Sequence, residues 1–312
     1  MKVLDIAKQV SSVTDRVGLG EKKAFELLIS MLKKAKAPYE VQFFDSRTPQ
    51  FFEASLRVDG QKVNCLPTGL KSGRITNNYN LLSSLTSSQP FIDTPNINFN
   101  PLSDEICVCN FYFAPSLAIS RLDLDKVACA KKVEGSLKVS SRKYRARNIL
   151  VGNLINPKHV VFAHYDAYFS GAVDNASGVG VVFELITKRP ELLVDSLFIL
   201  AGNEELSYDY PIYWGRGFRQ FNQANRNVLA AAKKILVIDC VGNTTPVLEK
   251  NPTIMKLAFP IGNYPKILSK TTLITSNFDA LLPVYHGPED TVALLSSSYL
   301  DQTLKLLEKN LA

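Results

Sequence analysis

The chain has 312 residues, of which 46% are hydrophobic and 21% are charged, a usage that supports one large α/β domain or a domain with an insertion. The net charge of +7 comes without a long basic run, so we expect a lysine-rich surface and no nucleic-acid partner. No apolar run reaches the ~18 residues of a membrane span, and the charged N-terminus is not a signal peptide, so we expect a cytoplasmic protein without membrane contact.

The first part of the chain predicts two helices and a strand. A short helix is expected over 2–13, and a stronger amphipathic helix over 21–36, where apolar residues recur at helical spacing until Pro38 stops them. Residues 39–44 are strand-like.

Residues 45–104 differ in character from the rest of the chain. They are rich in Ser, Asn, Thr and Pro and show only short β-like pieces, which indicates a small β-rich insertion or an irregular lid. A strand is expected over 105–113, where Cys107 and Cys109 alternate and are expected to pack rather than to bind a metal.

The remainder of the chain becomes regular. A helix is expected over 123–131 and two β-runs over 134–139 and 144–151. Apolar β-runs then alternate with helices; the strands are 159–163, 196–200, 235–238 and 273–275, and the helices are 177–187, 215–223 and 298–311. This alternation predicts an α/β fold, a three-layer sandwich with a mixed, largely parallel central sheet. The α/β domain would comprise residues 1–44 and 115–312, and residues 45–114 would form the insertion.

Polar side chains that suit a metal follow three of these strands directly. His164 and Asp166 follow the first, Glu204 and Glu205 the second, and Asp239 the third. In open α/β sheets, ligands bind at the carboxyl ends of the strands, so these groups should meet at one edge. Bringing them together is costly unless a cation neutralises the acids.

Two further residues complete the set. Asp174 lies among small residues at the entry to a helix, and His286 lies near the C-terminal end. Taken singly, each residue has an ordinary structural explanation, such as a helix cap or a solvated face. Together they offer two His, two Asp and one Glu, which suit a pair of Zn²⁺ or Co²⁺ ions with one bridging carboxylate. The glutamate beside the ligand glutamate is then free to act as a general base.

These segments resemble a known family, the co-catalytic zinc aminopeptidases of peptidase family twenty-eight, which includes aminopeptidase Y and bacterial leucyl aminopeptidases. The resemblance covers roughly 10–44 and 115–312. It rests on the segments 164–166, 171–178, 203–205, 238–242 and 285–291, together with Arg16-Val-Gly before the second helix.

The resemblance implies a role for each candidate ligand. Asp174 would bridge two metal ions, His164 and Asp239 would hold one ion, and Glu205 and His286 would hold the other. Zinc is the expected metal, with cobalt or manganese as substitutes.

The resemblance also implies roles for residues that do not bind metal. Glu204 would be the general base, and Asp166 would orient His164. The peptide between Asp174 and Asn175 would be cis. The implied activity is that of a metal-dependent aminopeptidase acting on peptides. Glutaminyl cyclisation with a single zinc, carboxypeptidase activity and a non-catalytic binding role remain as alternatives.

The chain departs from the family in regions that concern substrate recognition. The stretch between His164 and Asp174 is shorter than usual, and 276–283 lacks the usual Ser-Asp pair. The segment 45–114 is expected to correspond to a reduced form of the family's protease-associated insertion. An apolar pocket for the first substrate side chain is expected from some of Tyr165, Tyr168, Phe169, Phe278, Leu281 and Leu282.

Overall fold

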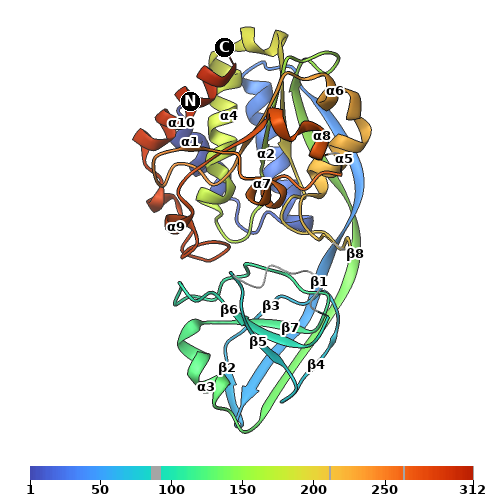
Figure 1. The fold of residues 1–312 in the computed structure, drawn as a ribbon, viewed down its shortest axis with the longest axis vertical. Helices are drawn as coiled ribbons and strands as arrows, with labels where there is room; N and C mark the ends of the chain where they lie inside the picture. Colours follow the sequence, from blue (N-terminus) through green and yellow to red (C-terminus); the bar gives the residue numbers. More distant parts are fainter. Residues whose placement is uncertain (86–92, 211, 263, 312) are drawn as a thin grey trace.

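A computed structural model describes residues 1–85, 93–210, 212–262 and 264–311. Two sheets of unequal size dominate the fold (Figure 1). The larger sheet has nine strands: β1 (Glu40–Val58), β2 (Gln61–Val63), β4 (Gly73–Ile75), β8 (Val133–Gly152), β9 (His159–His164), β10 (Ser196–Ala201), β11 (Lys234–Ile238), β12 (Val247–Glu249) and β13 (Thr271–Thr275).

The larger sheet is mixed, with a parallel centre. Its order is β12-β13-β11-β9-β10-β8-β1-β2, and β4 pairs with β8. Strands β13, β11, β9 and β10 run parallel, whereas β12, β8, β1 and β2 add antiparallel pairings. The parallel centre brings the carboxyl ends of β9, β10 and β11 to one edge of the sheet.

Apolar side chains of the central strands point alternately to the two faces of the sheet. Both faces must therefore be buried, and helices cover each of them. In β9, Val161 and Ala163 pack into one core, and Val160 and Phe162 pack into the other. The first core includes α1 (Val3–Ser11), α2 (Glu21–Lys34), α4 (Ser177–Lys188) and α10 (Ser297–Leu311). The second includes α5 (Arg216–Ala224), α6 (Arg226–Ala231), α7 (Pro252–Ala258) and α8 (Tyr264–Ile267). The fold is therefore the expected three-layer α/β sandwich.

A second, smaller part is carried on the long strands β1 and β8. These strands pair antiparallel over nearly their whole length and extend beyond the sandwich (Figure 1). A four-stranded sheet with the order β3-β7-β6-β5 lies beside them, together with α3 (Leu124–Ala128); its strands are β3 (Leu66–Pro67), β5 (Asn80–Ser83), β6 (Asn96–Phe99) and β7 (Ser116–Ile119). Because β1 and β8 run through both parts, the domain bounds at 44 and 115 stay a prediction.

Two expectations about secondary structure were wrong. The β-runs 134–139 and 144–151 join into the single strand β8. Residues 105–113 do not form the expected strand and make only an isolated bridge between Tyr112 and Gly69. The backbone there bonds to other partners instead, since Val108 N–H donates to the His286 carbonyl. None of the helices in the described ranges is long and apolar enough to cross a membrane.

Candidate metal centre

The candidate ligands meet where three parallel strands end. Strand β9 ends at His164, which pairs with Ala201 at the end of β10. Glu204 and Glu205 follow β10, and Asp239 follows β11, which is paired with β9 on its other side. The sheet register therefore brings these side chains to one edge, as the sequence predicts.

Asp174 is held at this edge by its neighbours. The Asp290 carboxylate accepts hydrogen bonds from the backbone N–H of Val173 at 2.7 Å and of Asp174 at 3.0 Å. The Asn175 side chain donates to the Ile238 carbonyl at the end of β11, at 2.8 Å. The Asp174–Asn175 peptide is cis, as the resemblance implies.

Asp174 presents one carboxylate oxygen to each of two imidazoles. Its Oδ1 lies 3.2 Å from His164 Nε2, and its Oδ2 lies 3.3 Å from His286 Nε2. Each imidazole nitrogen also faces a second acid: His164 Nε2 lies 3.2 Å from Asp239 Oδ1, and His286 Nε2 lies 2.8 Å from Glu205 Oε2. The result is two groups of three ligand atoms that share Asp174.

The backbone fixes which nitrogen of each imidazole faces the acids. His164 Nδ1 lies 3.1 Å from the carbonyl of Asp166, and His286 Nδ1 lies 3.3 Å from the carbonyl of Val108. A neutral imidazole donates its Nδ1 proton there, which leaves the Nε2 lone pair directed at carboxylate oxygens. Lone pairs on both sides repel unless a cation or a proton lies between them, so this donor set fits a metal ion on each side of Asp174.

The charges of the centre favour the same assignment. Burial alone would raise the pKa of Asp174, but hydrogen bonds with both imidazoles hold that pKa below its ordinary value. Burial alone would lower the pKa of His164 and of His286, but the facing acids raise both well above the ordinary value. Burial raises the pKa of Glu205 to about 7. Without a metal, bound protons thus neutralise the negative charge of the buried acids, and divalent cations can replace these protons.

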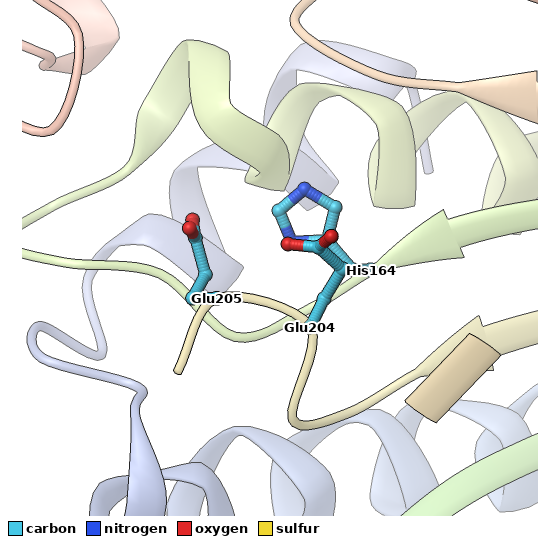
Figure 2. Close-up of side chains that lie close together, drawn as sticks. All are labelled: His164, Glu204 and Glu205. Atoms are coloured by element: carbon cyan, nitrogen blue, oxygen red, sulfur yellow. The ribbon is translucent and has the colours of Figure 1, made fainter. Parts of the chain in front are cut away.

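Glu204 and Glu205 differ in their partners at the centre. Figure 2 shows both carboxylates close to His164, and ligand atoms of the three residues lie within 4.8 Å of one another, whereas Glu205 Oε2 also lies 2.8 Å from His286 Nε2. Glu204 is 7% exposed, and burial raises the pKa of its carboxyl group well above the ordinary value. The Glu205 backbone N–H donates to Asp166 Oδ2 at 3.0 Å. Asp166 therefore contacts both sides of the centre, through its carbonyl at His164 and through its carboxylate at Glu205.

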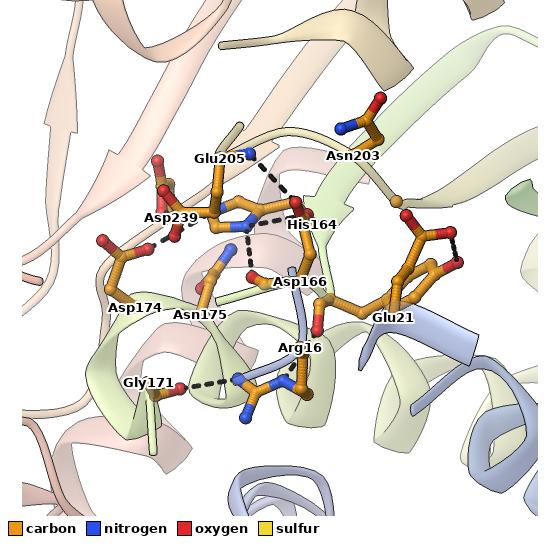
Figure 3. A network of polar contacts seen from close by, with 12 residues as sticks. Arg16, Glu21, His164, Asp166, Gly171, Asp174, Asn175, Asn203, Glu205 and Asp239 are labelled. Carbon is orange, nitrogen blue, oxygen red and sulfur yellow. Dashed lines mark hydrogen bonds and ion pairs between the residues drawn. The ribbon is translucent and has the colours of Figure 1, made fainter. Parts of the chain in front are cut away.

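A buried arginine braces the loop that joins His164 to Asp174 (Figure 3). Arg16 is fully buried and donates to the carbonyl of Tyr165, next to His164, at 2.8 Å. It also donates to the carbonyls of Ser170 at 2.7 Å and Gly171 at 3.0 Å, ahead of Asp174. One guanidinium group thus contacts both ends of the loop between the two candidate ligands.

A pocket of about 330 Å³ opens onto the centre, and His164, Asp174, Glu204, Glu205, Asp239 and His286 all line it. Phe278, Leu281 and Leu282 line it as well, which agrees with the expectation of an apolar wall. Tyr168 and Phe169 line a different cavity, of about 500 Å³, and the buried Tyr165 hydroxyl contacts Glu21 at 3.0 Å.

The smaller part of the molecule also contributes to this pocket. Ser84, Leu85, Cys109 and Asn110 line it, and none of them was among the residues predicted from the sequence. The Val108 carbonyl at His286 was missed too, because a backbone acceptor leaves no signal in the residue types. Of the three histidines in the chain, His159 lies at the opposite end of β9 and outside the centre.

The fold is that of known zinc aminopeptidases. Over 98% of this chain and 94% of the other, it matches a zinc aminopeptidase from Bacillus subtilis with a TM-score of 0.69 at 18% identity. A family twenty-eight peptidase precursor from Shewanella amazonensis matches over 99% and 92% of the two chains (TM-score 0.68, 13% identity). A glutaminyl cyclase from Porphyromonas gingivalis matches over 99% and 96% (TM-score 0.54, 13% identity). No family model and no curated protein matches the sequence. The chain thus has a zinc-exopeptidase-like fold with a buried His, Asp and Glu candidate metal centre.

Proposed function

We propose that this chain is a two-zinc aminopeptidase that removes the first residue from peptides. The observation that supports this most directly is the position of Asp174, which offers one oxygen beside each of two imidazoles. A single-metal site has no use for a carboxylate shared in this way, whereas a two-metal site needs one bridging ligand.

Each ion would have its own residues in addition to the shared one. His164 and Asp239 would hold the first ion, and Glu205 and His286 the second, with Asp174 between them. When bound, such a pair of ions polarises the scissile carbonyl and lowers the pKa of the attacking water.

Glu204 would then move the proton. Glu204 lies close to His164 and Glu205 but belongs to neither of the two ligand clusters that contain Asp174. Its carboxylate is therefore not needed as a ligand and can accept a proton. It would take the proton from the attacking water and deliver it to the leaving amine.

The lining of the pocket suits a peptide substrate. Its apolar wall, with Phe278, Leu281 and Leu282, suits an aliphatic or aromatic first side chain. Cys109 and Asn110 line the same pocket, so the smaller part would also contact the peptide.

Glutaminyl cyclisation is the second candidate, because the fold also matches glutaminyl cyclases. That reaction releases ammonia from an N-terminal glutamine and needs no attacking water. If it used one zinc, only one of the two imidazole groups that face Asp174 would bind metal.

The test is a substrate panel with zinc-loaded protein. We expect release of the chromophore from leucyl p-nitroanilide and none from its N-acetylated form, since blocking the amine abolishes aminopeptidase action. Ammonia release from glutaminyl peptides without hydrolysis of leucyl substrates would support the cyclase instead. Hydrolysis of N-blocked peptides from their free carboxyl end would indicate a carboxypeptidase.

A further inference from the structure

A second cavity borders the segment that helps to line the metal-centre pocket. Cys109 and Asn110 line the metal-centre pocket. Their neighbours Val108 and Phe111 line a separate cavity of about 500 Å³. The proposed mechanism uses no part of this second cavity, so its lining is available to another ligand.

The sandwich, the long strands and the smaller sheet all contribute to this cavity. Residues of the segment 15–20 line it together with 48–51 of β1, Arg142 of β8 and both residues of β3. The segment 15–20 packs closely on β1, because a Cβ added at Gly18 would lie 2.5 Å from Thr48 Oγ1. Thr48 in turn pairs with Arg142 across the two strands. The segment 15–20 and Arg142 therefore adjoin each other at the cavity.

Aromatic rings form one wall of the cavity. Phe111 stacks with Phe51 and with Tyr168, at 6.4 Å and 5.6 Å between ring centroids. These three rings and Phe169 all line the cavity. Such a wall suits an apolar or aromatic group of a small ligand.

The cavity also carries one charged group of each sign. Arg142 is exposed, and its guanidinium makes no hydrogen bond or ion pair with any residue in the described ranges. Asp15 is exposed too, and its Oδ1 accepts a hydrogen bond from the Phe169 N–H at 3.0 Å, which uses only one of its two carboxylate oxygens. A guanidinium suits a carboxylate, and a carboxylate suits an ammonium group.

Two contacts connect this cavity with His286. The Tyr168 ring lies 5.3 Å from the His286 ring, measured between centroids. The Val108 carbonyl lies 3.3 Å from His286 Nδ1, and the Val108 N–H donates to the His286 carbonyl at 2.9 Å. His286 has a φ of 50°, in the left-handed region that a non-glycine residue keeps only where its surroundings impose it. A ligand that contacts Tyr168 and Val108 would therefore act on the residues that hold this imidazole.

We propose that this cavity binds an apolar α-amino acid, and that its occupancy is coupled to metal binding through Tyr168 and Val108. The carboxylate of the amino acid would lie at Arg142, its ammonium group at Asp15 and its side chain on the aromatic wall. An aminopeptidase releases such amino acids, so the cavity would be a product site. The coupling rests on the proposed function in one respect, namely that His286 is a metal ligand.

The first experiment measures binding of L-phenylalanine to zinc-loaded protein by calorimetric titration. It compares wild type with Arg142→Ala and with Lys143→Ala, the matched control, because the next residue of β8 points to the other face of the sheet. We expect a dissociation constant of about 1 mM or below for wild type and Lys143→Ala. Loss of the charge-assisted hydrogen bonds should weaken binding at least about tenfold in Arg142→Ala.

Three related compounds test the assigned contacts. Glycine lacks the apolar side chain, N-acetyl-L-phenylalanine lacks the ammonium group, and phenethylamine lacks the carboxylate. Each should bind wild type at least about tenfold more weakly than L-phenylalanine. A compound that binds as tightly as L-phenylalanine would refute the contact that it lacks.

The second experiment measures the coupling. Zinc affinity is measured with and without L-phenylalanine, with an indicator dye that reports free zinc, so that zinc bound by the free amino acid does not affect the value. Coupling between two sites is reciprocal and commonly changes affinity about 5–150-fold. We expect a change of at least about fivefold in wild type and Lys143→Ala, and little effect of the same L-phenylalanine concentration in Arg142→Ala.

Two results would overturn the inference. One is equal binding of L-phenylalanine to wild type and Arg142→Ala, which would place the amino acid at the metal centre. The other is a zinc affinity that saturating L-phenylalanine leaves unchanged in wild type. Neither readout needs turnover, so a protein inactive on every peptide would refute the proposed aminopeptidase function and still leave this test decisive.

Discussion

The assignment of two adjacent glutamates to different roles gives the sharpest prediction. Glu204→Gln preserves the shape of a side chain that is 7% exposed, so the pocket should keep its form and both metal ions should stay. The substitution removes only the proton acceptor. General base catalysis contributes about 10²–10⁴-fold, which at ~1.36 kcal/mol per decade corresponds to roughly 2.7–5.5 kcal/mol of the barrier. We expect a loss in kcat of that size.

Glu205→Gln is the matched control. Glu205 Oε2 lies 2.8 Å from His286 Nε2, so the substitution removes the charge of a ligand atom at the second ion. We expect weaker binding of one zinc per chain and partial recovery of turnover in excess zinc. Zinc content, by elemental analysis after gel filtration, and kcat would be measured for both variants in parallel. If Glu204→Gln loses metal while Glu205→Gln keeps it, the two roles are exchanged; if neither changes turnover, the assigned site is wrong.

Three further perturbations test the surroundings of the centre. The Asp290 carboxylate accepts hydrogen bonds from the backbone N–H groups of Val173 and Asp174, and Asp290→Asn leaves only one acceptor oxygen for them. Zinc affinity, measured by calorimetric titration, should fall about 10–100-fold, and unchanged affinity would contradict that support. Burial raises the pKa of Glu21 from 4.5 to about 8, so the folded state holds a proton that the unfolded chain releases between these values. The stabilisation by Glu21 is then complete below about pH 4.5 and is lost as pH rises to 8. The Tm of wild type minus the Tm of Glu21→Gln should therefore fall across this window. A difference that does not change with pH would refute the buried protonated state. Phe278→Ala should lower kcat/KM for leucyl relative to alanyl substrates roughly tenfold, whereas an unchanged ratio would place the specificity pocket elsewhere.

The strand-end residues could be predicted because their chemistry and their position in the fold agree. His164 and Asp239 each occur at the end of an apolar β-run, and parallel strands bring such ends together whatever the loops do. The helices α2 and α4 were predicted close to their observed bounds, because their apolar periodicity is strong.

The missed features depend on contacts that leave no local pattern. Strand β1 extends from Glu40 to Val58 although Pro49 lies within it, and its length follows from pairing with β8 across the whole ribbon. The segment around Val108 has the composition of a strand, yet its backbone bonds to His286, far away in the sequence. Neither tertiary contact can be inferred from periodicity or composition.

The proposed two-metal centre depends on Asp174 as the residue that bridges the ions. A crystal grown with excess zinc, with anomalous difference maps recorded on both sides of the zinc absorption edge, tests it directly. We expect two zinc peaks about 3.5–4 Å apart, one beside His164 and one beside His286, with one Asp174 oxygen near each. A single peak, or zinc bound away from Asp174, would refute the bridging role of Asp174.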